Sequence, residues 1–297
     1  WSISRRAHPE VAQRLGPPLL AGDLIGANAI SEPNVGSDPS SIQCRAVRKG
    51  DSYVINGTKC WISNGHIADV VVLVAQTDPG LGPAGVRQFV VDRRESPFKS
   101  RDIETIGLKA FPTSELFFDD VAIPATHRLD GWPASDGNAT DPAKSFPQVL
   151  QGIAAARVGT ALISVGIAQR AFEIALEYVK VRKQFGKEIG RFQLVQEMIA
   201  EMATEIDAAR LLCYRAMQFS RRARCDAEVS MAKAYATEMA VRVTSKAIQA
   251  MGALGLAVES RVERCLRDAR MLTIPDGTTQ IQNLIIGRAL IGMSAIR

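Results

Sequence analysis

The feature that most constrains the fold is a change of hydrophobic periodicity near the middle of the chain. From Leu24 to about Pro124, short apolar or alternating runs are separated by turn residues such as Gly50-Asp51. From about residue 148 onward, apolar residues recur every three or four positions, which is typical of helices packed on a core. The order, strands first and helices afterwards, predicts an α+β fold built from two successive domains. The 297 residues are enough for both to have cores.

The first domain, residues 23–128, is predicted to be a small antiparallel β-barrel or sandwich. Residues around Tyr53 and Ile55 alternate in polarity and are followed by Asn56-Gly57. This dipeptide favours a hairpin turn, because both residues tolerate positive φ. Val70 to Ala75 and Arg87 to Val91 are β-branched and apolar, so they predict buried strands.

The second domain, residues 148–297, is predicted to be a four-helix bundle. Residues 129–147 are rich in Gly, Pro, Asp, Ser and Asn and predict a linker. Three long helical stripes follow, the third ending at Gly252, and a last helix is expected to start near Thr279. The stripes are marked by Leu150, Ile153, Leu162, Val165, Phe172, Leu176 and Val179, by Phe192, Val195, Ile199, Met202, Ile206 and Ala209, and by Ala232, Tyr235, Met239, Val243, Ala247 and Met251.

Composition and charge narrow the class of protein. The chain is 46% hydrophobic and 23% charged, and its net charge of +5 is made of interspersed acids and bases, so we expect no nucleic-acid partner. No apolar run approaches the ~18 residues of a membrane helix, so no membrane partner is expected. Five scattered cysteines without metal-ligand spacing indicate reduced thiols in the cytoplasm and no metal site. The first residue is Trp1, so we expect the true N-terminus to lie upstream.

Two segments of the first domain carry residues that suit a binding site, and each also has a purely structural interpretation. Residues 30–38 form either a surface turn or a strand end whose free N–H groups and hydroxyls hold a polar ring or a thioester. Residues 59–65 contain Trp61, which is either a core side chain or the wall of a cofactor site.

Two segments of the second domain leave similar alternatives. Residues 182–187 either place basic charge at a helix C-terminus that Gly186 ends, or offer Arg182 for a bidentate contact with a pyrophosphate. Residues 274–282 contain Asp276 and Thr278 before the last helix. Asp or Thr at this place is either an N-cap or part of a site.

Taken in order, these segments resemble the acyl-CoA dehydrogenase family. The family motifs T-E-P-x-x-G-S-D, K-x-W-I-T-N-G, R-x-x-F-G-K, Q-x-x-G-G-x-G and Y-E-G-T-x-x-I-Q match residues 31–38, 59–65, 182–187, 249–255 and 275–282. The resemblance runs from about His8 to the end. It implies an N-terminal helical domain, a middle β-domain, a C-terminal bundle and a homotetramer. Residues 1–22 would be the remnant of the first domain, and we expect roughly a hundred further residues ahead of them.

The resemblance also implies a bound FAD and a set of site residues. Asp276 would be the catalytic base, and Ser37, Arg157 and Gly277 would lie against the substrate. The residues expected to contact FAD are Ile30, Ser31, Trp61 and Ser63 at the flavin, Arg182, Phe185, Gln249 and Gly252 near the pyrophosphate from a neighbouring subunit, and Thr278 and Gln280 near the adenine half.

Three positions depart from the family pattern. Ala253 replaces the second Gly of G-G-x-G, and serines replace the usual threonines at 31 and 63. Asp276 stands where the family has Glu, and Ala156 occupies the alternative base position on the first bundle helix. Because Asp is one methylene shorter, proton transfer needs a substrate that comes closer, such as a ring or a polar group, or the abstraction of a different proton.

The resulting hypothesis is the α,β-dehydrogenation of an acyl thioester of CoA or of a carrier protein. Electrons would pass to an electron-transfer flavoprotein or to oxygen. Two alternatives stay open: a flavin oxidase or monooxygenase on the same scaffold, and a non-catalytic FAD-binding subunit of a hetero-oligomer.

Overall fold

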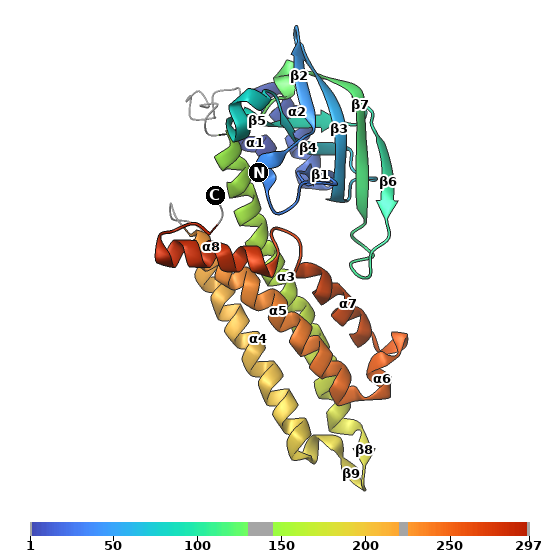
Figure 1. Ribbon diagram of the computed structural model, residues 1–297. Coiled ribbons are helices and arrows are strands. Elements are labelled where there is room, and N and C mark those ends of the chain that lie inside the picture. Colours follow the sequence, from blue (N-terminus) through green and yellow to red (C-terminus); the bar gives the residue numbers. More distant parts are fainter. Residues whose placement is uncertain (1, 130–144, 220–224, 296–297) are drawn as a thin grey trace. The chain divides into compact units, whose positions relative to one another are not determined.

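The computed structural model describes residues 2–129, 145–219 and 225–295 (Figure 1). The chain divides into two compact units, one of residues 1–105 and 109–152 and the other of residues 106–108 and 153–297. The first unit contains the sheet and the second is helical, so the predicted α+β class is confirmed. Most of the predicted linker, residues 130–144, lies outside the described residues.

The first unit is a mixed sheet with two short helices. Its elements are α1 (Ser2–Arg6), α2 (Pro9–Ala21), β1 (Gly26–Ala29), β2 (Arg45–Lys49), β3 (Ser52–Ser63), β4 (Val70–Gln76), β5 (Val86–Asp92), β6 (Lys99–Ile103) and β7 (Thr113–Pro124). The strands follow the order β1-β4-β2-β3-β7-β6, and β5 pairs with β4. Most pairs are antiparallel, as predicted, but β1 and β2 each pair with β4 in parallel. Every residue of β5 is buried.

The predicted hairpin at Asn56-Gly57 is wrong. The turn falls at Gly50-Asp51, between β2 and β3, and β3 continues through Asn56-Gly57 with a shift of register against β7. Gly57 has φ +142°, and a Cβ there would lie 2.8 Å from the Cα of Cys44. The glycine is therefore required by close packing of two backbones at a bulge, which the local sequence does not distinguish from a turn.

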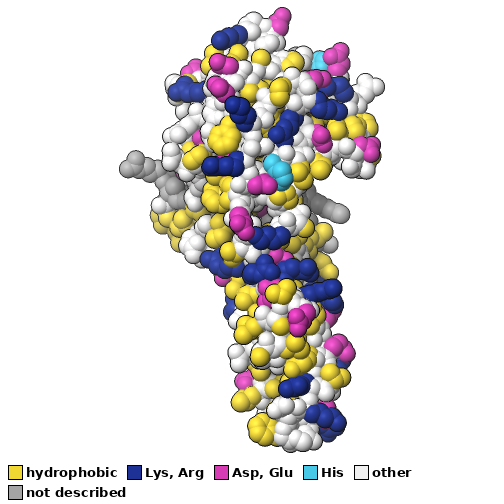
Figure 2. All heavy atoms as spheres, turned by 90° about the vertical axis from the view of Figure 1, so that its right-hand side faces the viewer, with side chains coloured by type: hydrophobic (Ala, Val, Ile, Leu, Met, Phe, Trp, Pro, Cys, Tyr) yellow, Lys and Arg dark blue, Asp and Glu magenta, His cyan; other side chains and the backbone are white. Residues whose placement is uncertain are grey.

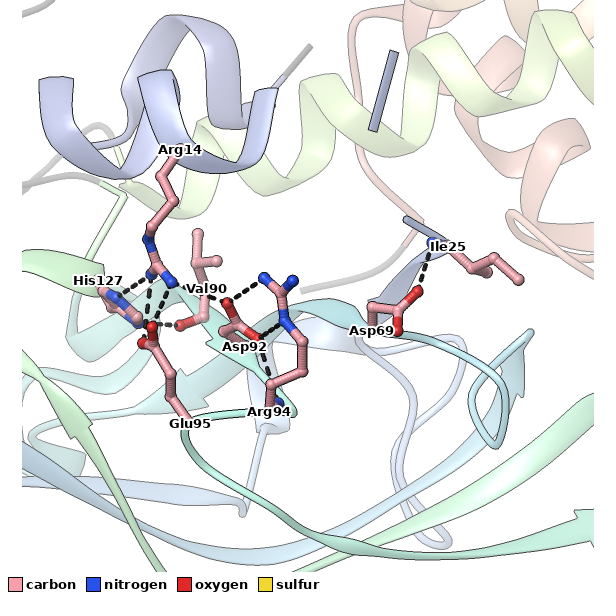
Figure 3. A network of polar contacts seen from close by, with 8 residues as sticks. All are labelled: Arg14, Ile25, Asp69, Val90, Asp92, Arg94, Glu95 and His127. Carbon is pink, nitrogen blue, oxygen red and sulfur yellow. Dashed lines mark hydrogen bonds and ion pairs between the residues drawn. The ribbon is translucent and has the colours of Figure 1, made fainter. Parts of the chain in front are cut away.

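Helix α2 is attached to the sheet by a polar network around the buried Asp92 (Figure 3). Arg14 donates from its Nη1 to the buried carboxylate of Asp92 at 3.0 Å, and it also contacts Glu95. His127 lies 3.3 Å from Arg14 through Nε2 and 3.0 Å from the carbonyl oxygen of Val90 through Nδ1. The structure thus groups residues 2–21, expected as the remnant of a preceding domain, with the sheet.

The second unit is built from long helices around an alanine-rich core. Its elements are α3 (Ser145–Val181), β8 (Lys183–Gln184), β9 (Lys187–Glu188), α4 (Gln193–Phe219), α5 (Asp226–Met251), α6 (Ala253–Leu256), α7 (Val262–Leu272) and α8 (Thr279–Ile291), with α3 starting in the first unit. Ala161, Ala168, Ala171 and Ala175 of α3 pack with Met202 and Ile206 of α4 and with Met239 and Val243 of α5. Helices α7 and α8 pack on α5. The predicted long helices and the start of the last helix are confirmed.

Helix α3 also has the length and composition of a membrane span. The expectation from uninterrupted apolar runs therefore missed it, because its apolar residues are separated by small and single polar ones. In its most apolar window 28% of the residues are buried in the chain. Such a helix is weak evidence for a membrane, since core helices satisfy the same criteria. The alanines that α3 contributes to the core favour a bundle helix.

Candidate functional site

Asp276 lies in a strained loop between α7 and α8. Its φ is +57°, and that of the following Gly277 is +92°. A left-handed conformation is uncommon for a residue with a side chain and requires support from its surroundings. Gly277 is needed for space as well, since a Cβ there would come within 2.8 Å of the Gln282 amide nitrogen. The backbone conformation here is set by contacts from other elements.

Three side chains hold this loop through its carbonyl oxygens. Arg157 of α3 donates from Nε to the carbonyl oxygen of Asp276 at 2.8 Å. Gln282 of α8 donates to the carbonyl oxygens of Asp276 and Gly277, at 3.1 and 2.8 Å. Lys233 of α5 donates from Nζ to the carbonyl oxygens of Thr273 and Gly277, at 3.0 and 2.9 Å. Each end of the loop is therefore fixed to a helix.

The carboxylate of Asp276 has its own partner. Thr160 of α3 donates from its hydroxyl to Oδ2 of Asp276 at 2.7 Å. Thr160 and Arg157 are three residues apart on α3, so their side chains lie on one face of the helix. One face of α3 thus contacts both the backbone and the carboxylate of Asp276.

Burial governs the charges around Asp276. The Lys233 side chain is fully buried, and burial lowers its pKa to about 8, although the charge of Asp276 acts in the opposite direction. Burial likewise lowers the pKa of the Arg157 guanidinium, again opposed by Asp276. Two cations and one carboxylate therefore share a poorly hydrated region, where their interactions are stronger than in water.

The N-cap interpretation of this segment applies to Thr278. Its hydroxyl accepts a hydrogen bond from the backbone N–H of Ile281 at 3.4 Å, at the first turn of α8. Asp276 precedes the cap by two residues, and the helix is capped without it. Gln280 lies on the first turn of α8 and is exposed.

A cavity of about 450 Å³ lies where α3 and α5 end. Arg182 lines it together with Gln249 and Gly252, which follow 67 and 70 residues later in the sequence. The other lining residues are Tyr178, Gln184, Ile189, Ala250, Met251, Ala253 and Leu254. Three of the four residues expected near a pyrophosphate are therefore brought together.

The fourth, Phe185, lies at the turn of the β8–β9 hairpin and is 93% exposed. Phe185 and Gly186 both have positive φ, as a two-residue hairpin turn requires. Helix α3 ends at Val181, so Gly186 is a turn residue and not the stop of the helix. An aromatic ring held out into water at a hairpin turn is available for contact with another molecule.

In the first unit, a buried ion pair joins the two predicted flavin segments. Lys59 donates from Nζ to the carbonyl oxygen of Ile30 at 2.9 Å and to the carboxylate of Glu32 at 2.8 Å. The backbone N–H of Cys60 donates to the carbonyl oxygen of Ser31 at 2.9 Å. Lys59 and Glu32 are both buried, and burial lowers the pKa of Lys59. Residues 30–31 and 59–61 therefore lie side by side.

Trp61 is not a core residue. It is 60% exposed and has φ +63°, at a second register shift of β3 between Lys59 and Ile62. Of the two interpretations of Trp61, this exposure excludes the core side chain. Ser63 ends β3 and is half-buried, and Ser37 is exposed next to Asp38, which caps the short helical turn Pro39–Ser41. A large aromatic side chain exposed on a strand suits a ligand ring.

Sequence reasoning missed Thr160, Lys233 and the Glu32–Lys59 pair. Lys233 gave a signal, since it is a lysine beside the apolar stripe of the third predicted helix. Glu32 and Lys59 stood inside quoted motifs without a role. Thr160 gave no signal beyond its position one turn after Ala156.

Comparisons with known proteins define the class to which this fold and site belong. The family model "Acyl-CoA dehydrogenase, C-terminal domain" matches residues 146–291, and "Acyl-CoA dehydrogenase, middle domain" matches residues 27–121. Together they cover most of the chain, which therefore belongs to the acyl-CoA dehydrogenase family. The resemblance drawn from the motifs is confirmed.

Individual relatives agree. The chain is 39% identical over 271 residues to cyclohex-1-ene-1-carbonyl-CoA dehydrogenase of Syntrophus aciditrophicus, covering 90% of this chain and 63% of that protein. An acyl-CoA dehydrogenase structure from Geobacillus kaustophilus matches with a TM-score of 0.89 and 36% identity, over 97% of this chain and 74% of that one. A glutaryl-CoA dehydrogenase structure from Mycobacterium smegmatis in complex with FADH2 matches with a TM-score of 0.89 and 31% identity. The match covers 100% of this chain and 73% of that one.

Proposed function

We propose that this chain forms the middle and C-terminal domains of an FAD-dependent acyl-CoA dehydrogenase, with Asp276 as the base. The observation that carries the proposal is the loop of Asp276, where a carboxylate in a strained backbone is held by side chains from three helices. A residue that only capped a helix would not need this support, and Thr278 already caps α8. The family membership supplies the reaction.

The residues present fit an FAD. The cavity at the ends of α3 and α5 offers the guanidinium of Arg182 beside Gln249 and Gly252, a donor set that suits a pyrophosphate. Trp61 exposes its indole next to residues 30–31, which suits contact with a flavin ring. We assign Ile30, Ser31 and Ser63 to the same contact, and Thr278 and Gln280 to the adenine half. FAD, when bound, supplies the acceptor for the β-hydride.

In the proposed reaction, the carboxylate of Asp276 takes the proton from the carbon alpha to the thioester carbonyl. This proton is weakly acidic, so the carbonyl oxygen must be polarised as negative charge develops on it. We assign one donor to the backbone N–H of Asp276, as the family resemblance implies. A fixed donor at such a position contributes ~3–4 kcal/mol to transition-state stabilisation. Loss of this proton to Asp276, together with loss of the β-hydride, would leave an α,β-unsaturated thioester.

The short side chain of Asp276 bears on the substrate. A carboxylate one methylene shorter than Glu reaches only an α-carbon that comes closer to the loop. The relative from Syntrophus aciditrophicus is named for a six-membered ring carbonyl-CoA, which supports a cyclic acyl-CoA as the substrate. Ser37, Arg157 and Gly277 are assigned to the side of the site that holds the thioester.

The test is flavin bleaching under anaerobic conditions with three thioesters: cyclohex-1-ene-1-carbonyl-CoA, glutaryl-CoA and butyryl-CoA. We expect at least one to bleach the flavin, the cyclic one fastest. Asp276→Asn should retain FAD and slow bleaching at least ~100-fold, whereas Asp207→Asn, an exposed exchange on α4, should have no effect. Asp276→Glu should lose activity on the ring and gain it on butyryl-CoA. Bleaching by none of the three would favour a non-catalytic FAD-binding subunit.

The electron acceptor and the assembly are part of the same proposal. We propose an electron-transfer flavoprotein as the acceptor, and rapid reoxidation of the reduced enzyme by oxygen would instead indicate an oxidase or monooxygenase.

We also propose a homotetramer, because Phe185 and further apolar side chains are exposed on the helical unit, several of them visible on the face shown in Figure 2. An active monomer in sedimentation would contradict this. All five cysteines are free thiols, which supports a cytoplasmic location.

A further inference from the structure

Thr160 differs from four other hydroxyl-bearing residues inside the long helices of the second unit. Ser164, Thr204, Thr237 and Thr244 each donate to the carbonyl oxygen four residues earlier on their own helix, at 2.7–2.9 Å. This local bond is the usual one for a hydroxyl in a helix. Thr160 donates instead to Oδ2 of Asp276, 116 residues away in sequence. The carbonyl oxygen of Ala156, four residues earlier on α3, is the acceptor that this local pattern would use, so the long-range bond needs its own explanation.

The bond restricts how the Asp276 carboxylate can rotate. The terminal torsion of an aspartate is broad and has no strong preference of its own. The loop carbonyls are fixed by Arg157, Lys233 and Gln282, but those contacts act on the backbone. Thr160 provides the bond that fixes the carboxylate itself. Among the described residues, Oδ1 of Asp276 has no hydrogen-bond partner.

We propose that Thr160 is a positioning residue for Asp276, committing Oδ2 to α3 and leaving Oδ1 to receive the α-proton of the substrate. The inference rests on the proposed function of Asp276. Its physical basis is that a short base has little reach, so an error in the orientation of the carboxylate is not compensated by side-chain length. A misplacement of about 1 Å in a reacting group costs up to ~100-fold in rate.

The experiment compares Thr160→Val, which keeps the shape and removes the donor, with Thr160→Ser, which keeps the donor. Each is measured as the FAD-loaded full chain, with whichever of the three thioesters bleaches the unmodified protein fastest. Thr160→Val should slow flavin reduction ~10- to 100-fold at saturating thioester, with the half-saturating concentration changed less than about twofold. Thr160→Ser should restore the rate to within about threefold. The matched control is Thr244→Val, which removes a buried hydroxyl that bonds its own helix and should leave the rate unchanged.

A double variant separates positioning from a general structural effect. If Thr160 acts through Asp276, Thr160→Val should slow reduction no further once Asp276→Asn is present. An equal further loss in the Asn background, or full activity of Thr160→Val alone, would overturn the inference. If Thr160→Val lost FAD or failed to fold, Thr160→Ala, which also removes the donor but with a smaller side chain, would take its place in the same comparison.

The outcomes also distinguish this inference from the proposed function. An inactive Asp276→Asn beside a fully active Thr160→Val refutes only the role of Thr160. A fully active Asp276→Asn, or no bleaching by any of the thioesters, refutes the proposed base and the role of Thr160 with it.

Discussion

The buried Lys233 predicts that the protein becomes more stable as the pH rises into the alkaline range. Its side chain is fully buried, and burial lowers its pKa from 10.5 to about 8. The charged groups that act on it are Asp276, which opposes the shift, Arg157, which adds to it, and Glu238, which opposes it. The ammonium group donates to two loop carbonyl oxygens, a task that the neutral amine with its two N–H groups can also perform.

The sign follows from proton binding in the two states. Below pH 8, Lys233 is protonated in both the folded and the unfolded chain, so it adds no pH dependence. Between pH 8 and 10.5, the unfolded chain binds the proton and the folded chain does not, so the free energy of unfolding rises with pH. A fall in pKa from 10.5 to about 8 corresponds to a rise of ~3 kcal/mol across this interval.

The assay compares the unmodified protein with Lys233→Met by denaturant unfolding at intervals from pH 7 to 10.5. Methionine keeps the length of the side chain and removes the charge and the donors. At pH 7 the variant leaves the carbonyl oxygen of Thr273 without its lysine donor, a cost of ~1–3 kcal/mol that the removal of a buried charge partly offsets. Other groups titrate in alkali, so the difference between the two proteins is the measured quantity. Parallel pH curves would refute the reasoning.

Three further predictions test other parts of the structure. Arg182→Ala should weaken FAD binding ~10-fold or more in equilibrium dialysis. The control Arg191→Ala removes an exposed arginine that pairs with Glu188 and should leave the affinity unchanged. Equal affinities of the two variants would mean that Arg182 is only a charge near the helix end. Gly57→Ala should lower the free energy of unfolding by ~1–3 kcal/mol. The loss should exceed that of Gly50→Ala, because Gly50 also has a positive φ but has open space around it. Equal losses would contradict the close-packing argument. Burial raises the pKa of Asp92, but hydrogen bonds from Arg94 outweigh this effect, so the pKa is lowered. The carboxylate should therefore contribute to stability above about pH 4, and this contribution should be lost as the pH falls further. Asp92→Asn should flatten this acid loss in melting curves, and an unchanged loss would exclude Asp92 as its cause.

Local chemistry explains what the sequence predicted well. The turn at Gly50-Asp51 and the long helices depend on residues close together in the chain, and the structure confirms them. Asn56-Gly57 carries the same local signal as a turn, yet the glycine is there because Cys44 approaches the backbone from another strand. For Trp61 the sequence left a core position and a cofactor wall open, and the register shift of β3 beside it, with its 60% exposure, excludes the core position. Contacts across strands are not encoded in the spacing of the residues that make them.

The site was predictable to the extent that its residues stand in motifs. The motif order led to Arg182, Gln249 and Gly252, and the structure places all three around one cavity. No motif contains Thr160 or Lys233, because their role depends on which loop folds against α3 and α5. The sequence therefore indicates the groups that touch ligands better than it indicates the groups that hold them in place.

The loop of Asp276 shows why the supporting residues matter as much as the base. A positive φ is unfavourable for Asp276, unlike Gly277, and such a conformation persists only where fixed contacts outweigh its cost. Here side chains of α3, α5 and α8 donate to backbone carbonyl oxygens of the loop. The carboxylate of Asp276 accepts its hydrogen bond from the hydroxyl of Thr160. Backbone and side chain are thus held by separate groups. A substitution can therefore misdirect the carboxylate without disturbing the loop, and the exchange of Thr160 for valine isolates that effect.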